Sequence, residues 1–125
     1  MIKECTMIEP LQCDENDSVV NVAKALREHV IRHIYVVNAK HYPVGVISIT
    51  DVNNRVVAEG KNPNTLQAKD IMTKDIQVYQ ETDDEREVYK TCVRNKTATC
   101  PIVRGNKLVG VVTIHELLQR ITTVE

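Results

Sequence analysis

The sequence predicts an α+β fold in which one β-α-β-β-α unit is used twice, with the two copies packed through their sheets about a pseudo-twofold axis. The first observation is an internal repeat: residues 44–51 (VGVISITD) match residues 109–116 (VGVVTIHE) at an offset of 65 residues. The second is that two further pairs of segments match in the same order, 34–38 with 99–104 and 17–26 with 83–92. The third is size, because a copy of about sixty residues is too small to close a core comfortably alone.

The elements of the first copy follow from capping residues, periodicity and β-branched runs. Asp17-Ser18 is a good N-cap pair, and the apolar residues from Val19 to Leu26 then recur at helical spacing. Two runs rich in Val and Ile predict short strands, because β-branched side chains suit a pleated, half-buried surface. These strands are Ile34–Val37 and Val44–Ile49, and a second helix is predicted to start at Asp51, run to Ala58 and end at Gly60.

The second copy repeats this order after a polar, turn-rich linker at residues 60–64. Its predicted elements are a strand near Ile76–Tyr79, a helix over 84–94, strands Cys100–Val103 and Leu108–Thr113 joined by a hairpin turn, and a helix from Ile114 to about Ile121. We place the first copy at residues 1–62 and the second at residues 63–125, together forming one compact module.

Composition limits both the core and the function. Hydrophobic residues make up 42% of the chain but aromatic residues only 3%, so the core is expected to be aliphatic. The net charge is −1 and no block of lysine or arginine occurs, which argues against a nucleic-acid partner. No long apolar run predicts a membrane span, and the N-terminus lacks the layout of a signal peptide. A cytoplasmic location is therefore expected.

Neither metal binding nor catalysis is predicted from the reactive side chains. The cysteines have no CxxC spacing and fall in or beside apolar stretches, so we interpret them as buried thiols rather than as metal ligands or disulfide partners. His115-Glu116 lacks the second histidine of His-Glu-x-x-His, and Ser48 has no histidine at a spacing that implies a triad. The sequence also lacks a Gly-x-x-x-x-Gly-Lys-Ser/Thr phosphate loop. We predict no catalytic residue and no enzymatic activity.

A duplicated junction carries the resemblance to a known family. Gly-x-x-Ser/Thr-x-x-acid occurs at the end of a predicted strand in both copies, as Gly45–Asp51 and as Gly110–Glu116. Ile31–Asn38 is similar to that family's segment of a basic residue, an apolar strand and an acid or amide, Cys100–Val103 to its Pro-Val-Val strand, and Lys69–Thr73 to its repeat-opening segment. The chain therefore resembles a tandem pair of CBS domains, a Bateman module, over essentially its whole length.

The first junction has a chemistry that can be argued from its residues. Ser48 and Asp51 lie three residues apart, across the end of a strand and the start of a helix. Free backbone N–H groups at such a place favour phosphate, and the serine hydroxyl can donate to it. The carboxylate of Asp51 can accept both hydroxyls of a ribose. Both residues also suit a plain structural role, Asp51 as a helix N-cap and Ser48 at a buried strand end.

The resemblance implies a regulatory module that senses an adenosyl ligand in the cleft between the two repeats. The ligand would be AMP, ADP, ATP or S-adenosylmethionine, and no cofactor is required. The resemblance implies that the acid grips the ribose, that the Ser or Thr meets the phosphate, and that adenine lies between apolar residues. Carried over by position, the ligand-binding residues of the first pocket are Ser48, Thr50, Asp51, Arg32, His33, Thr73, Asp75, Ile76 and Thr99.

The second pocket is expected to be the weaker one. By the same carry-over its residues are Met7, Ile8, Pro10, Thr113, His115 and Glu116. Glu116 stands where an aspartate is usual, and Ala98-Thr99 stands where the first copy has a basic pair. Lys96 is the nearest basic substitute. We therefore expect two unequal sites, with the phosphate-bearing ligand held more strongly at Asp51.

The resemblance also implies a homodimer, with a separate enzyme or transporter as the regulated partner. The departures at Ala98 and Glu116 leave an alternative open. In that alternative the chain is a ligand-free structural or interaction module that dimerises or docks on a partner enzyme.

Overall fold

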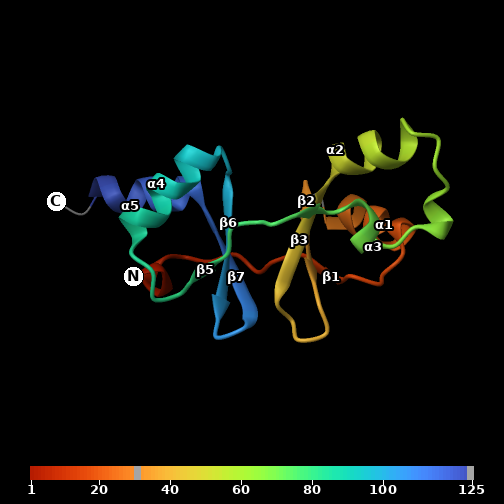
Figure 1. Cartoon of the computed structure of the whole chain (residues 1–125). Helices are drawn as coiled ribbons and strands as arrows, with labels where there is room; N and C mark the ends of the chain where they lie inside the picture. Colours follow the sequence, from red (N-terminus) through yellow and green to blue (C-terminus); the bar gives the residue numbers. More distant parts are fainter. Residues whose placement is uncertain (30–31, 124–125) are drawn as a thin grey trace. The chain divides into compact units, whose positions relative to one another are not determined.

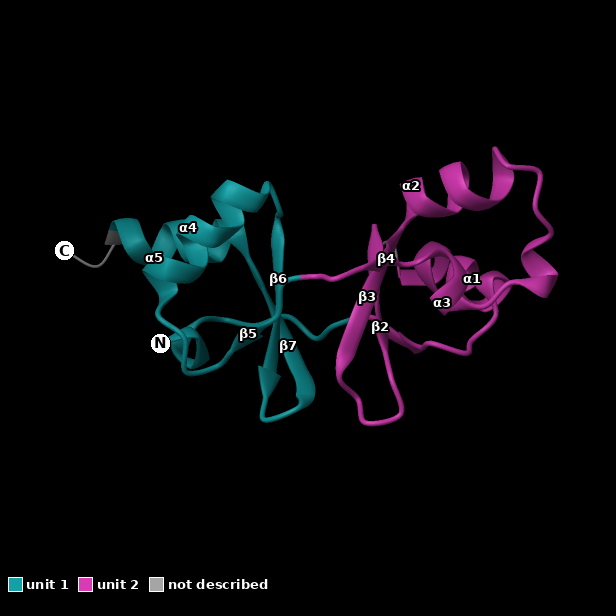
Figure 2. Ribbon diagram, viewed as in Figure 1, with its two compact units in different colours: residues 1–10, 77–125 teal, residues 11–76 magenta. Residues whose placement is uncertain are grey.

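The computed structural model describes residues 1–29 and 32–123 of the chain. The chain forms two compact units, which Figure 2 shows in different colours: unit 1 is residues 1–10 with 77–125, and unit 2 is residues 11–76. Each unit contains the predicted β-α-β-β-α succession (Figure 1).

Each unit takes a short segment from outside its own half of the chain. Residues 1–10 pack with the C-terminal elements, and the stretch after the linker, up to Ile76, packs with the N-terminal elements. The limits of the two copies along the sequence stay a prediction.

Unit 2 is built on a four-stranded sheet. Its elements are β1 (Gln12–Asp14), α1 (Val19–His29), β2 (His33–Val37), β3 (Pro43–Ser48), α2 (Ile49–Val52) continued by a π-helical turn (Asn53–Val57), a 3-10 turn (Pro63–Thr65), α3 (Ala68–Ile71) and β4 (Thr73–Lys74). The strand order is β1-β2-β3-β4, with β1 parallel to β2 and the other pairs antiparallel. Within the unit, the helices gather on one side of the sheet (Figure 2).

The core of unit 2 is aliphatic, as the composition predicted. Val19, Val22 and Leu26 recur every three or four residues along α1 and are all buried, which confirms the helical periodicity. They pack against Ile34 and Ile47 of the sheet. The burial of such side chains from water supplies the main favourable free energy of folding.

Unit 1 repeats this plan with a three-stranded sheet. Its elements are a 3-10 turn (Ile2–Glu4), β5 (Tyr79–Gln80), α4 (Glu85–Asn95), β6 (Thr99–Arg104), β7 (Lys107–Thr113) and α5 (Ile114–Thr123). The strand order is β5-β6-β7, with β5 parallel to β6 and β6 antiparallel to β7. The N-terminal segment adds an antiparallel bridge between Ile8 and Val111 on β7, in the place that β4 has beside β3 in unit 2.

Two sequence predictions differ from the structure, and two short strands were not predicted. The helix predicted to start at Asp51 starts at Ile49, because the hydroxyl of Ser48 accepts the backbone N–H of Asp51 and caps the helix two residues earlier. The strand expected near Ile76–Tyr79 is β5, at Tyr79–Gln80. The short strands β1 and β4 were not predicted, since pairing with longer neighbours forms them and their own sequence has little periodicity.

Candidate functional site

The first junction, at the end of β3, is closed by a reciprocal pair of hydrogen bonds. The backbone N–H of Ser48 donates to Oδ2 of Asp51 at 2.9 Å, and the backbone N–H of Asp51 donates to the Ser48 hydroxyl at 3.0 Å. This arrangement is a capping box, which satisfies two N–H groups that the helix cannot pair itself. The other carboxylate oxygen, Oδ1, lies 3.9 Å from Nε of Arg55, beyond hydrogen-bond distance.

The β2 strand brings the predicted basic pair to this junction. His33 is the register partner of Ser48 on the neighbouring strand, and the carbonyl of Arg32 accepts the backbone N–H of Ile49 at 3.0 Å. The His33 ring packs edge-on against Tyr35, with ring centroids 5.7 Å apart. Burial lowers the pKa of His33 below its ordinary value of 6.5, which favours the neutral ring at pH 7. The exposed Arg32 therefore supplies the positive charge of the pair.

The repeat-opening segment lies on the other side of β3. Thr73 pairs with Val46 in an antiparallel register, so the chain after Thr73 runs away from the Ser48 end of β3. Asp75, with a left-handed φ of 56°, and the half-buried Ile76 follow along this path. Thr73, like Thr50 on α2, is exposed. The structure thus gathers Arg32, His33, Ser48, Thr50 and Asp51 at one end of the sheet, and sets Asp75 and Ile76 further from it.

Arg55 belongs to this junction and was not among the predicted residues. Its Nη1 donates to the backbone carbonyls of Ile71 and Met72, at 2.8 Å and 3.0 Å. Arg55 therefore ties the helical segment after Asp51 to the chain that enters β4. The signal was present in the repeat, because the same 65-residue offset that matches the two junctions also matches Arg55 to Arg120.

The second junction, at the end of β7, has a different hydrogen-bond pattern. The Thr113 hydroxyl accepts the backbone N–H of Glu116 at 3.1 Å, which repeats half of the capping box. The carboxylate of Glu116 instead accepts the backbone N–H of Thr6 at 2.9 Å. Glutamate is one methylene longer than aspartate, so its carboxylate reaches the neighbouring N-terminal segment rather than its own N-cap.

The strands around this junction repeat the backbone contacts of the first site but lack its basic pair. Thr99 is the register partner of Thr113, as His33 is of Ser48. The backbone N–H of Ile114 donates to the carbonyl of Ala98 at 2.9 Å, which matches the Ile49 to Arg32 bond. Ala98-Thr99 therefore occupies the structural place of the basic pair, and Lys96 lies exposed at the C-terminal cap of α4. Thr99 belongs to unit 1, whereas Asp51 belongs to unit 2.

The remaining predicted residues of this junction lie on the N-terminal segment and on α5. Met7 lies over Gly110, since a Cβ on that glycine would come within 2.7 Å of the methionine sulfur. Met72 has the matching position over Gly45, which makes it a residue that the sequence prediction missed. Ile8 makes the bridge to β7 and is exposed, Pro10 is half-buried, and His115 is exposed on α5.

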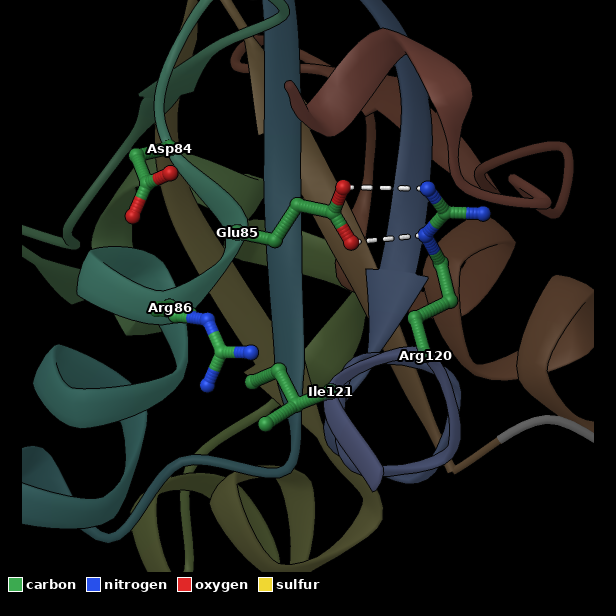
Figure 3. Close-up of a pocket in the computed structure, with 5 residues that line it drawn as sticks. All are labelled: Asp84, Glu85, Arg86, Arg120 and Ile121. Atoms are coloured by element: carbon green, nitrogen blue, oxygen red, sulfur yellow. Dashed lines mark hydrogen bonds and ion pairs between the residues drawn. The ribbon is translucent and has the colours of Figure 1, made fainter. Parts of the chain in front are cut away.

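A small pocket lies elsewhere in unit 1. Its volume is about 80 Å³, and it is lined by Asp84, Glu85, Arg86, Arg120 and Ile121 (Figure 3). Arg120 donates from Nε and Nη2 to the two oxygens of Glu85, at 2.6 Å and 3.0 Å. These bonds hold the pKa of Glu85 below its ordinary value and raise that of Arg120. This pocket is an ion-paired contact between α4 and α5, and it holds none of the predicted ligand residues.

Neither a metal cluster nor a membrane-crossing helix occurs among the described residues. Within residues 1–29 and 32–123, no three His, Cys, Asp or Glu side chains gather in a way that could hold a metal ion. None of the helices in this described part combines the length and apolar character that a bilayer crossing needs.

Comparison with known sequences gives a family match and several relatives. The family model of the CBS domain matches the chain twice, over residues 2–58 and 68–123. An uncharacterised protein of Methanopyrus kandleri is 36% identical over 104 residues, which make up 82% of this chain and 53% of that protein. The inosine-5′-monophosphate dehydrogenase of Methanocaldococcus jannaschii is 29% identical over 121 residues, which make up 96% of this chain and 22% of that enzyme. The chain thus spans less than two thirds of either relative.

Comparison with solved structures gives the same architecture. A CBS domain pair in complex with 5′-methylthioadenosine and S-adenosyl-L-methionine superposes with a TM-score of 0.77 at 22% identity, covering 100% of this chain and 98% of that one. Hypoxic Response Protein I, solved with two coordinated zinc ions, superposes with a TM-score of 0.79 at 18% identity, covering 94% and 96%. At such identities the likeness establishes the fold.

Proposed function

Since the chain belongs to the CBS domain family and carries two copies of the domain, we propose that it is a regulatory module that binds an adenosyl ligand at the Ser48–Asp51 junction. A CBS pair is a regulatory module, and the two β-α-β-β-α units account for most of this chain. The proposal assigns no catalytic step to it. Its output would be a change in the stability or assembly of the module when the ligand prefers one arrangement of it.

One observation carries the choice of this junction. Asp51 accepts the N–H of Ser48 through Oδ2, while its Oδ1 lies 3.9 Å from Nε of Arg55. The carboxylate is about four-fifths buried, with 18% of the side chain exposed. A carboxylate oxygen has two lone pairs, so Oδ1 could accept a ribose hydroxyl while the capping box stays intact. The site would then bind without losing a helix cap.

The charge around the junction supports a ligand that carries a phosphate or another negative group. Arg32 and Arg55 are both exposed and lie on either side of Asp51 along the chain. Guanidinium groups bind phosphate and carboxylate through paired N–H donors. AMP, ADP and ATP supply phosphates, and S-adenosylmethionine supplies a carboxylate. The CBS pair solved with 5′-methylthioadenosine and S-adenosyl-L-methionine supports the adenosyl part that all these ligands share.

The Glu116 junction is proposed to bind the same ligand more weakly. Its carboxylate already accepts the backbone N–H of Thr6, and Ala98-Thr99 stands in the place of the basic pair Arg32-His33. The Thr6 N–H occupies only Oε2, so Oε1 could still accept a ribose hydroxyl. The place of Arg32 is taken by Ala98, however, so no guanidinium is there to bind a phosphate or carboxylate of the ligand. The two sites are therefore proposed to differ in affinity.

Assembly and location are proposed on the family alone. The chain would act in the cytoplasm as a homodimer and would regulate a separate enzyme or transporter. Sedimentation of the purified protein with and without ligand tests the dimer.

A thermal-shift panel tests whether the module binds a ligand at all. A ligand that binds only the folded state raises Tm once its concentration exceeds Kd. We expect a rise with at least one of AMP, ADP, ATP, S-adenosylmethionine and 5′-methylthioadenosine, and none with GMP at the same concentration. Equal responses to AMP and GMP would contradict recognition of adenine. A flat response across the panel would favour the ligand-free interaction module, in which the Glu116–Thr6 bond has only a structural role.

A further inference from the structure

Three of the four cysteines lie in the core of unit 1. Cys5, Cys92 and Cys100 are all buried in one apolar cluster, and Cys13 lies half-buried in unit 2. Cys92 is on the last turns of α4, and Cys100 is the second residue of β6. Their sulfur atoms are 2.6 Å apart. The two residues are therefore in direct contact although eight positions separate them along the chain.

This separation is shorter than ordinary contact between two unbonded groups. Non-bonded heavy atoms attract best at about 3.5–4.0 Å, and the sulfur atoms of a disulfide are about 2.05 Å apart. The distance between the Cys92 and Cys100 sulfurs lies between these values, and the two side chains already point at each other. Little movement of α4 against β6 is needed to join them.

Cys92 and Cys100 are fully buried, but the segment that connects them is exposed. All six residues from Val93 to Ala98 are exposed. Lys96 has a left-handed φ of 58°, and the N–H of Thr97 donates back to the carbonyl of Cys92 at 3.1 Å. Short exposed helix ends open locally at a low free-energy cost, far below that of global unfolding. Opening of this segment would bring a small oxidant to both thiols.

We propose that Cys92 and Cys100 are a modification site at which hydrogen peroxide installs a reversible disulfide within unit 1. The Cys92 thiolate attacks one peroxide oxygen, the O–O bond breaks, and the released hydroxide takes up a proton to leave as water. Cys92 is then a sulfenic acid. The Cys100 sulfur displaces its hydroxyl, the S–S bond forms, and the hydroxide leaves as water with the Cys100 proton. Two thiols and one peroxide give one disulfide and two waters.

The surroundings assign Cys92 as the residue that reacts first. The hydrogen bond from the Cys100 thiol lowers the pKa of Cys92, whereas this same contact and then burial raise the pKa of Cys100. The hydroxyl of Tyr79 lies 3.6 Å from the Cys92 sulfur, within reach of a thiolate. Burial raises the pKa of Cys5 to about 11, and that of Cys13 to about 12. Those two cysteines stay protonated and react slowly, because the thiolate is the nucleophile.

The proposed bond would fix the C-terminal end of α4 to the start of β6. Cys100 follows Thr99, which pairs with Thr113 at the second junction. A short covalent loop restrains the unfolded chain, so the oxidised protein is expected to unfold at a higher temperature.

Intact-mass analysis of the whole protein tests the proposal. Fully reduced protein is treated with hydrogen peroxide, quenched with catalase, denatured and alkylated with N-ethylmaleimide. Of the four cysteines, we expect two to be alkylated, and peptide mapping to find Cys92 joined to Cys100. Dithiothreitol should restore four alkylated cysteines, and Tm should be higher in the oxidised protein by about 5 °C.

Matched variants separate this pair from its neighbour. Cys5→Ala removes the third thiol of the cluster and should leave the Cys92–Cys100 link unchanged, whereas Cys100→Ala should abolish it. Four alkylated cysteines after peroxide treatment of the wild type would overturn the proposal. A link that involves Cys5, or sulfinic acid at Cys92 without a link, would overturn it as well.

Discussion

The carboxylate of Glu116 accepts the backbone N–H of Thr6, at 2.9 Å and across 110 positions of the sequence. In the matching junction the carboxylate of Asp51 bonds within three positions, to the N–H of Ser48. The equivalent acidic residues of the two halves of the chain therefore have different hydrogen-bond partners. In one half the acid closes its own helix cap, and in the other it holds a distant segment.

Shortening Glu116 should release the N-terminal segment. In Glu116→Asp the carboxylate is one methylene shorter, so it should return to the N–H of Thr113 and leave that of Thr6. We expect the Thr6 amide proton to exchange with solvent at least about tenfold faster, as the loss of one charge-assisted hydrogen bond implies. Hydrogen exchange followed by NMR measures this. The Ile8 amide, which donates to Val111 at 2.9 Å, is the internal control and should change little. Equal acceleration at both amides would mean that the whole segment had detached.

Removing the hydroxyl of Ser48 should destabilise unit 2 through its helix cap. Ser48→Ala leaves the N–H of Asp51 without its acceptor, and the expected loss in the free energy of unfolding is about 1 kcal/mol. Ser48→Asn retains an acceptor at the N-cap and is the matched control. Urea unfolding measures both variants, and an equal loss in the two would show that the side-chain oxygen has no capping role.

Gly45 and Gly110 each lie against a methionine side chain, and their substitution by alanine should lower the free energy of unfolding by different amounts. A Cβ at Gly45 would meet Met72 Sδ at 2.5 Å and the backbone carbonyl of Thr73 at 2.9 Å. A Cβ at Gly110 would meet only Met7 atoms among its nearest neighbours. Because a side chain can move and a paired strand cannot, we expect Gly45→Ala to cost about 1–3 kcal/mol and Gly110→Ala less.

Double variants provide the control for that comparison. Met7→Ala should relieve most of the cost of Gly110→Ala, whereas Met72→Ala should relieve only part of the cost of Gly45→Ala. Complete relief in both backgrounds would contradict a role for the Thr73 carbonyl.

The Glu85–Arg120 ion pair should make unit 1 sensitive to acid. The folded state holds the pKa of Glu85 below its ordinary value of 4.5, so the pair's stabilisation is present above that value. It is lost as the pH falls through the lower, folded-state pKa. We expect Tm of the wild type to fall more between about pH 6 and about pH 3 than Tm of Glu85→Gln.

An exposed ion pair serves as the control for this pH dependence. Arg27 and Glu28 are 4.0 Å apart and largely solvent-accessible, so Arg27→Gln should follow the wild-type curve. If Glu85→Gln followed the wild-type curve too, the ion pair would have no part in the acid sensitivity.

The order of helices and strands was predictable because the sequence patterns that indicate them are local. Val19, Val22 and Leu26 carry helical spacing within one helix, and the β-branched runs that became β2 and β3 need no knowledge of their partners. The helix start was not predictable to the residue, since Ser48 and Asp51 are both good N-cap residues and only the hydrogen bonds distinguish them. The 65-residue offset located both junctions correctly as strand-to-helix turns.

Long-range contacts set the limit of the sequence prediction. The bond between Thr6 and Glu116 and the contact between Cys92 and Cys100 depend on packing that no periodicity encodes. Arg55 and Arg120 share the repeat offset, yet one bonds backbone carbonyls and the other bonds Glu85. A repeat in the sequence therefore predicts equivalent places in the fold, and the partners of each side chain must be read from the structure.

Isothermal titration calorimetry of Asp51→Asn against Glu116→Gln tests the central claim most directly. Asparagine can still accept the N–H of Ser48, so the helix cap is kept while the carboxylate is lost. With AMP and with S-adenosylmethionine as titrants, we expect Kd of whichever binds the wild type to rise about 10- to 100-fold in Asp51→Asn and to change little in Glu116→Gln. Equal weakening in the two variants, or unchanged affinity in Asp51→Asn, would contradict the assignment of the ligand to the Ser48–Asp51 junction.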